Sequence, residues 1–233
     1  MDPRHLFVDE RHGGRCVYCG AQPDTRDHVP SKVLLDEPYP HELPVADACS
    51  SCNAAFSLDE QYLACMIECV MSGSAEPSSL QRTKIKRILH EVPTLQRRIK
   101  ESQRKDSAGN LTWHAEVDRI RKIILKLARG HAAYELYPKI DEPDRVDFSP
   151  ALALSDQERA LFEGAESGGH GPWPEIGSRA FLRACGKTTD RFEEVGGWIT
   201  VQPGRYRYSV VEGGGVLVRM VLSEYLACAV SWE

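Results

Sequence analysis

The sequence predicts an α+β fold in which a small metal-binding region precedes helices and a C-terminal antiparallel β region. Three observations predict it. Two Cys-x-x-Cys pairs lie near the N-terminus, apolar residues recur at helical spacing through the middle, and apolar and polar residues alternate near the C-terminus. We therefore expect three regions: residues 1–74 with the metal site, residues 75–138 with helices and a basic face, and residues 139–233 as an α+β accessory region.

Length and composition are typical of a soluble globular protein. The chain has 233 residues, of which 42% are hydrophobic and 27% charged, and it is long enough to bury a core. No apolar run approaches the roughly 18–20 residues that a membrane span needs. The charged start, residues 1–14, lacks the apolar segment of a secretory signal. We expect a cytoplasmic protein that does not contact a membrane.

The two Cys-x-x-Cys pairs predict a metal site rather than disulfides, because cytosolic thiols stay reduced. Cys16–Cys19 and Cys49–Cys52 each place two thiolates on one tight turn. Two such turns complete a tetrahedral zinc site that has no open position for a substrate. We therefore expect a structural Zn²⁺ held by these four cysteines.

A helix is expected directly after the second pair, from about Leu58 to Met71. Its apolar residues recur at steps of three and four: Tyr62, Leu63, Met66, Ile67 and Val70. The preceding "SLDE" is an S-x-x-E capping box, with Ser57 as N-cap and Glu60 reaching back. Cys65 and Cys69 are expected to be buried packing thiols, as are Cys185 and Cys228.

The middle region is expected to form helices over residues 78–92 and 115–137, with a turn or short hairpin around Gly109–Asn110. Gly130 falls inside the second helix, where a bend is expected. Residues 81–105 are rich in Lys and Arg. These side chains form either an ordinary solvated helix face or a phosphate-contacting surface, since Lys and Arg release counterions from nucleic acid. The nucleic-acid candidates here are Lys84, Lys86 and Arg87.

The C-terminal residues 196–233 alternate apolar and polar residues, and Pro203–Gly204 and Gly213–Gly215 interrupt the alternation. This pattern predicts antiparallel strands joined by hairpins. A shorter helix is expected within residues 173–185. The tyrosines of "RYRYSV" form either an aromatic core face or a platform for stacking bases.

Between the cysteine pairs lies the segment "TRDHVPSKVLL", with Asp27 and His28 adjacent. Neighbouring residues of a strand point to opposite faces. If the strand bends, one of the two side chains can ligate a metal while the other stands beside it as a base. The position of this dipeptide between two zinc knuckles favours that interpretation over ordinary surface polarity.

The ordered segments CVYCG, RDHVP and CSSCN resemble the HNH endonucleases, in particular the subgroup whose ββα-metal fold is stapled by a four-cysteine zinc site. The resemblance covers residues 16–63, and the continuation "CNxxFSxDExYL" is similar to a set of bacterial HNH proteins. It implies that Asp27 is a ligand of a catalytic Mg²⁺ or Mn²⁺, that His28 is the general base, and that Asn53 is the second protein ligand. Asp47 lies nearest to the family's middle Asn.

The chemistry of these residues agrees with the roles that the resemblance implies. Phosphodiester hydrolysis needs an activated water and a cation that absorbs developing charge. Mg²⁺ keeps several waters and accepts one carboxylate and one amide oxygen as a partial shell. A histidine is neutral and basic near neutral pH.

One position departs from the family pattern. Many HNH proteins carry His or Lys three residues after the Asn, where this chain has Phe56. Asp59 and Glu60 are the candidates that fill this gap, Asp59 through contact with the metal or a water, and a role in capping the helix is the alternative for both. Arg26 and Lys32 flank the expected base and are the local candidates for contact with the scissile strand.

We therefore expect a metal-dependent HNH endonuclease that hydrolyses DNA phosphodiester bonds. Two alternatives stay open. One is a zinc-dependent nucleic-acid or protein-binding module that has lost turnover, and the other is a ribonuclease. The expected partner is DNA, with RNA, a protein partner and a homodimer as further options.

Overall fold

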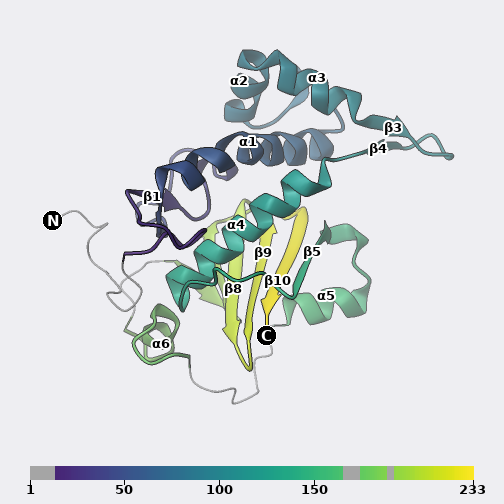
Figure 1. Cartoon of the computed structure of the whole chain (residues 1–233). Helices are drawn as coiled ribbons and strands as arrows, with labels where there is room; N and C mark the ends of the chain where they lie inside the picture. The colour runs from purple at the N-terminus through teal and green to yellow at the C-terminus, as the bar shows by residue number, and fades with distance from the viewer. Residues whose placement is uncertain (1–13, 165–173, 188–191) are drawn as a thin grey trace. The chain divides into compact units, whose positions relative to one another are not determined.

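The computed structural model of the chain describes residues 14–164, 174–187 and 192–233 (Figure 1). It contains both helices and antiparallel sheets, which confirms the α+β class. These residues form two compact units, one of residues 56–123 and one that combines the segments before and after it. The expected boundaries after residues 74 and 138 stay predictions. The expectation about a secretory signal falls mainly on residues 1–13, outside the described residues.

The N-terminal part of the chain forms two short strands followed directly by a helix. Strand β1 (Thr25–His28) pairs with β2 (Val45–Ala48) in antiparallel register, so Asp27 lies opposite Ala46 and His28 opposite Val45. The 3₁₀ helix η2 (Lys32–Leu34) lies between the strands in sequence. Helix α1 (Ser50–Ser72) begins two residues after β2. The order of elements is therefore strand, strand, helix.

Helix α1 begins earlier than its apolar spacing predicts. The expected start near Leu58 is wrong, because the Asp24 carboxylate accepts hydrogen bonds from the Ser50 amide (2.6 Å) and the Ser50 hydroxyl (2.9 Å). An acidic group at a helix N-terminus satisfies free amides and suits the helix dipole. Ser57 consequently lies inside the helix, and the expected capping box is wrong.

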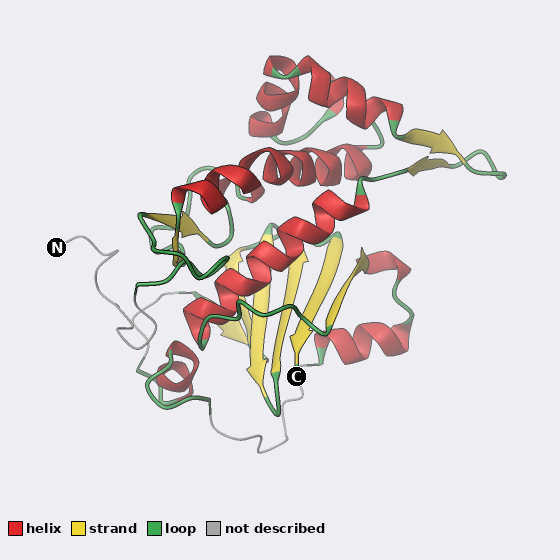
Figure 2. Cartoon of the chain, viewed as in Figure 1, coloured by secondary structure: helices red, strands yellow, loops and turns green. Residues whose placement is uncertain are grey.

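The C-terminal region is an antiparallel sheet, as expected (Figure 2). The strand order is β5-β10-β9-β8-β7-β6. The strands are β5 (Arg145–Pro150), β6 (Glu193–Val195), β7 (Trp198–Gln202), β8 (Tyr206–Glu212), β9 (Val216–Leu222) and β10 (Leu226–Trp232). The turns expected at residues 203–204 and 213–215 join β7 to β8 and β8 to β9. The turn at Ser223–Glu224, where both residues have positive φ, was not foreseen because it lacks glycine.

The two faces of this sheet are covered by different helices. On β8, Tyr206 and Tyr208 are fully buried, and the His131 ring of α4 (Val117–Glu135) stacks on Tyr208 with ring centroids 3.8 Å apart. Arg207 points to the other face and binds the Glu163 carboxylate of α5 (Asp156–Glu163) through two hydrogen bonds of 2.7 Å. The tyrosines of "RYRYSV" therefore form a core face and do not stack on bases.

Helix α4 continues through Gly130. A Cβ atom at this position would lie 2.5 Å from Cγ2 of Val29, so the glycine allows the helix to approach the end of β1 closely. Gly130 thus marks a packing contact.

Further along α4, the buried Glu135 accepts hydrogen bonds from the Tyr208 hydroxyl (2.6 Å) and from Arg183 (3.0 Å).

The remaining elements of the larger unit are short. Helix α6 (Arg179–Ala184) lies within the expected range 173–185, whose first residue, Trp173, falls outside the described residues. The 3₁₀ helix η4 (Ala151–Ala153) follows β5. Cys228 is buried, as expected, but Cys185 is exposed, because α6 ends at residue 184 and leaves it in the following turn.

The unit of residues 56–123 is mostly helical, as expected. Besides parts of α1 and α4, it contains η3 (Pro77–Ser79), α2 (Thr83–Glu91), α3 (Pro93–Glu101) and a hairpin of β3 (Gln103–Lys105) and β4 (Leu111–Trp113). The hairpin confirms the turn expected at Gly109–Asn110. Cys65 and Cys69 are buried, as expected.

Among the residues that the structure describes, no helix has the length and apolar character that crossing a bilayer requires.

Candidate metal centre

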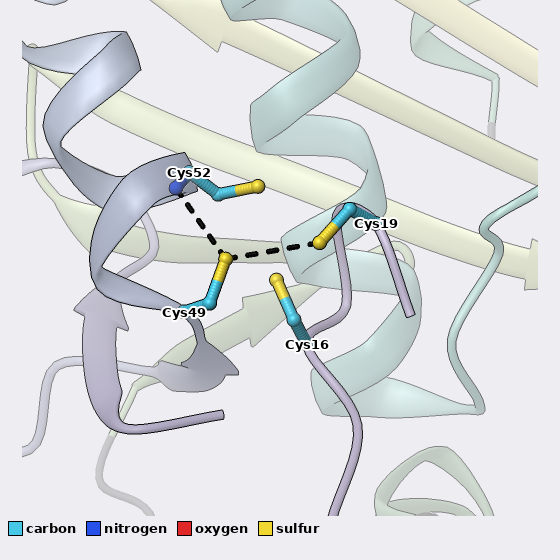
Figure 3. Close-up of side chains that lie close together, drawn as sticks. All are labelled: Cys16, Cys19, Cys49 and Cys52. Carbon is cyan, nitrogen blue, oxygen red and sulfur yellow. Dashed lines mark hydrogen bonds between the residues drawn. The ribbon is translucent and has the colours of Figure 1, made fainter. Parts of the chain in front are cut away.

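The four cysteines of the two Cys-x-x-Cys pairs form one cluster. Their sulfur atoms all lie within 4.8 Å of one another, and those of Cys19 and Cys49 are 3.7 Å apart. Figure 3 shows the four sulfurs pointing toward a common centre. Zn–S bonds of about 2.3 Å in a tetrahedron place the sulfurs about 3.8 Å apart. The cluster is therefore compatible with a structural zinc site, and residues Cys16, Cys19, Cys49 and Cys52 would hold the ion.

Different elements position the two halves of the cluster. The first pair lies in a turn that is closed by hydrogen bonds from the Cys16 amide to the Ala21 carbonyl (2.7 Å) and from the Gly20 amide to the Cys16 carbonyl (2.8 Å). Gly20 has a φ of +75°, which favours glycine. In the second pair, Cys49 follows β2 and Cys52 lies in the first turn of α1. A bound ion would therefore join the first turn to the start of the helix.

The thiols of this cluster differ in their acidity. The nearby Ser51 hydroxyl (3.1 Å) and the Cys52 amide lower the pKa of Cys49 to about 6. Burial, together with the neighbouring Cys19 and Cys49 thiols, raises the pKa of Cys52. Adjacent thiolates repel one another, and a cation between them removes that penalty. The electrostatics thus favour a metal that binds all four as thiolates.

Asp27 lies in a buried ion pair. The Lys126 ammonium of α4 is 2.6 Å from its Oδ2 atom, and the Lys126 side chain is 0% exposed. The Tyr18 hydroxyl donates a 2.7 Å hydrogen bond to the same oxygen. Lys126 also donates to the Ser31 hydroxyl (2.8 Å). Asp27 therefore connects the first cysteine turn, which carries Tyr18, with a helix about 100 residues further along the chain.

His28 and Asn53 lie on different elements, and only the one that carries Asn53, helix α1, also carries a cysteine of the cluster. His28 is the last residue of β1 and is half-buried. Asn53 is half-buried in the first turn of α1, one residue after Cys52. Its backbone N–H donates a hydrogen bond to the Cys49 carbonyl (3.0 Å). The hydrogen bonds of Asp24 to Ser50 tie the segment before β1 to the start of α1.

The residues expected beside the base have partners nearby. Arg26 lies opposite Asp47 in the β1–β2 ladder, and their side chains form a partly exposed ion pair of 3.6 Å. Asp47, the residue expected nearest to the middle Asn of the HNH pattern, is therefore ion-paired with Arg26. Lys32 begins η2, and its ammonium lies 5.6 Å from the Tyr39 ring centroid. Contact of Arg26 and Lys32 with a scissile strand stays a prediction.

Asp59 belongs to the unit of residues 56–123, where two cations bind it. Arg119 and Lys122 lie 2.5 Å and 2.7 Å from its two carboxylate oxygens. Burial opposes ionisation of Asp59, but the hydrogen bonds from Lys122 and Arg119 outweigh it, and the pKa of Asp59 is lowered. Lys122 also lies 5.6 Å from the Phe56 ring centroid. Arg119 and Lys122 thus balance the negative charge of Asp59 without a metal ion. The expected contact of Asp59 with a metal stays a prediction.

The unit of residues 56–123 is basic, although the chain as a whole has a net charge of −5. It contains twelve Lys and Arg residues against nine Asp and Glu residues. Lys84 and Lys86 are half-exposed on α2, and Arg87 is exposed. By contrast, Lys100 and Arg98 are paired with Glu76 and Glu116. Part of the basic run therefore forms ion pairs within the unit.

Tyr18 and Lys126, the two partners of Asp27, were missed from the sequence. Tyr18 lies between the first two cysteines, in a segment interpreted only as a zinc knuckle. Lys126 stands in the apolar run "IILKLA", and a lone charge on a buried helix face was the available signal that it has a buried partner. No local pattern connects positions 27 and 126.

Among the described residues, only the four cysteines form a group of three or more Cys, His, Asp or Glu side chains close enough to hold a metal. Comparisons with protein-family models, with curated proteins and with solved structures find no match to the chain. Function is therefore inferred from the residues and their arrangement.

Proposed function

We propose that the chain is a metal-dependent endonuclease of the HNH type, which hydrolyses phosphodiester bonds of DNA. The observation that carries this proposal is the arrangement of Asp27, His28 and Asn53. Asp27 and His28 end β1, and Asn53 lies in the first turn of α1, one residue after the cluster cysteine Cys52, in an element order of strand, strand and helix. That is the order of elements in a zinc-stapled ββα-metal module.

The donor set fits a divalent ion that keeps most of its water ligands. Tyr18 and Lys126 both contact the Oδ2 atom of Asp27. The other carboxylate oxygen, Oδ1, takes no part in these two contacts. Asn53 adds a neutral amide oxygen. Mg²⁺ and Mn²⁺ prefer oxygen ligands, and Mg²⁺ usually takes only one or two carboxylates from the protein. Asp27 and Asn53 are therefore the residues that would hold the ion.

His28 supplies the proton transfer in this proposal. A neutral imidazole accepts a proton from the attacking water and becomes cationic beside the developing phosphorane. When bound, the divalent ion supplies stabilisation of the negative charge that forms on the phosphoryl oxygens. Arg26 and Lys32 orient the scissile strand through its phosphates. A zinc ion held by the four cysteines would join the first cysteine turn to the start of α1, which carries Asn53.

Nicking of supercoiled plasmid by the zinc-loaded protein with Mg²⁺ or Mn²⁺ tests this proposal. We expect His28→Ala to lower the rate by about 100-fold or more, since general-base catalysis contributes about 10²–10⁴-fold. Asn53→Ala is expected to lower the rate because the divalent ion loses a protein ligand. His41→Ala is a matched control, because His41 is exposed in the loop between η2 and β2. Unchanged rates in both site variants would end the assignment of these residues.

The second candidate is a zinc-stapled module that binds nucleic acid or protein without turnover. Two observations favour it: Phe56 stands where many HNH proteins have a basic residue, and Asp27 is ion-paired with Lys126. A wild-type protein that cleaves neither DNA nor RNA with any divalent ion, yet binds one of them by fluorescence anisotropy, would support this candidate. Cleavage of RNA alone would identify a ribonuclease.

A further inference from the structure

The Asp27 carboxylate, proposed above as a ligand of the divalent ion, already has a cation beside it. The Lys126 ammonium lies 2.6 Å from Oδ2, and neither side chain is more than 9% exposed. In such a place the charges are weakly screened, so a close like charge strongly disfavours a second cation. Lys126 therefore bears directly on whether a divalent ion can bind to Asp27.

We infer that the Lys126 ammonium and the divalent ion compete for Asp27. This inference rests on the proposed function, because it takes Asp27 as a metal ligand. Lys126 neutralises the carboxylate and, with Tyr18, fixes its orientation. Binding of a divalent ion then requires either that the ammonium moves away or that both cations share one carboxylate, and each option weakens the ion's affinity.

Ser31 offers the ammonium a second acceptor. The Lys126 Nζ atom lies 2.8 Å from the Ser31 hydroxyl, so it keeps one hydrogen bond when Asp27 turns toward another cation. A buried ammonium without an acceptor would be strongly destabilising. The competition is therefore physically possible without unfolding of α4 or β1.

The test is a Mn²⁺ titration of zinc-loaded protein, with free Mn²⁺ followed by its electron paramagnetic resonance signal. We expect Lys126→Met, which keeps the length and removes the charge, to bind Mn²⁺ at least about tenfold more tightly than the wild type. Lys126→Arg keeps the charge and is expected to stay near wild type. Lys122→Met is the matched control, because Lys122 pairs with Asp59 in the other compact unit.

A second readout is thermal stability. Without Mn²⁺, Lys126→Met leaves the Asp27 charge buried and unpaired, so its melting temperature falls below that of the wild type. With saturating Mn²⁺ the gap closes, because the ion takes over the neutralisation. Adding Asp27→Asn to Lys126→Met is expected to abolish both the tighter binding and the rescue.

The outcomes separate this inference from the proposed function. Equal Mn²⁺ affinity in wild type and Lys126→Met, in a wild type that cleaves DNA, overturns the competition and leaves the nuclease in place. Tighter binding in Lys126→Met with no cleavage by any variant supports the competition while the nuclease proposal fails. A Lys126→Met protein that stays unfolded at every Mn²⁺ concentration also overturns the inference, because the ion then cannot replace the lysine.

Discussion

The Tyr18 hydroxyl donates a 2.7 Å hydrogen bond to the Asp27 carboxylate, so a residue inside the first cysteine turn directly contacts the strand of the proposed nuclease site. The contact is buried. The cysteine turn is also joined to the partner strand β2 by the hydrogen bond from the Val17 amide to the Asp47 carbonyl (3.0 Å). The Tyr18–Asp27 contact thus links the turn that carries two of the four clustered cysteines to the proposed site.

Replacement of Tyr18 by Phe removes this hydroxyl and keeps the ring. We expect a loss of about 1–2 kcal/mol in the free energy of unfolding, because a buried carboxylate loses one of its donors. Urea denaturation of the zinc-loaded proteins measures it. Tyr39→Phe is the matched control, since the Tyr39 hydroxyl donates to exposed Glu37 and its loss is expected to change stability by less than about 0.5 kcal/mol. Equal effects of the two variants would contradict the importance of the Tyr18 contact.

The four-cysteine cluster predicts one tightly bound zinc per chain. We expect Cys19→Ser to lose the ion and to melt at a much lower temperature, because structural zinc contributes about 10–16 kcal/mol of apparent binding energy in zinc-finger peptides. Elemental analysis and calorimetry measure the two effects. Cys185→Ser, at an exposed cysteine outside the cluster, should keep both zinc and stability. Folded wild type without zinc would refute the site.

Asp59 gives a prediction about pH. Its pKa is lowered in the folded protein, so its ion pairs with Arg119 and Lys122 stabilise the fold above the usual Asp pKa of 3.8 and are lost as the pH falls through the lower folded value. We expect Asp59→Asn to be less stable than wild type by about 1 kcal/mol at pH 7. The difference should shrink below about pH 4. Chemical denaturation at both pH values measures it, and a difference independent of pH would contradict the ion pairs.

Gly130 gives a prediction about packing. Alanine is the better helix former by about 1 kcal/mol, but its Cβ atom would lie 2.5 Å from Val29. We expect Gly130→Ala to destabilise the protein by about 1–3 kcal/mol through overpacking. The additional change Val29→Ala makes room and should recover part of the loss, which a double-mutant cycle measures. A stabilised Gly130→Ala variant would show that α4 and Val29 are not in close contact.

Local sequence signals predicted the parts of the fold that depend on neighbouring residues. The cysteine spacings, the β-hairpins at glycine and the helical spacing of α2 and α4 are such signals. The start of α1 was missed because its cap, Asp24, lies 26 positions before Ser50. The Ser223–Glu224 turn was missed because its positive φ angles occur without glycine. In both cases tertiary structure outweighs local preference.

The same distinction holds for the candidate site. The spacing of the two cysteine pairs was sufficient to predict that their thiols meet. The surroundings of Asp27 could not be predicted, because Lys126 is 99 positions away and belongs to a helix whose apolar pattern indicated only core packing. The metal contact expected of Asp59 stays a prediction. Its ion pairs with Arg119 and Lys122 were not foreseen, because these partners lie about 60 positions further along the chain.

The Asp27–Lys126 pair also limits how the metal-binding region could be inherited or transplanted. Residues 1–74 carry all four cysteines of the candidate zinc site and each of the three proposed nuclease residues, and they look like a self-contained cassette. Moved alone into another protein, that cassette would bring a carboxylate whose charge is balanced from outside its own sequence. The portable unit is therefore discontinuous, and recombination that exchanges only the N-terminal segment must also supply a counterion for Asp27.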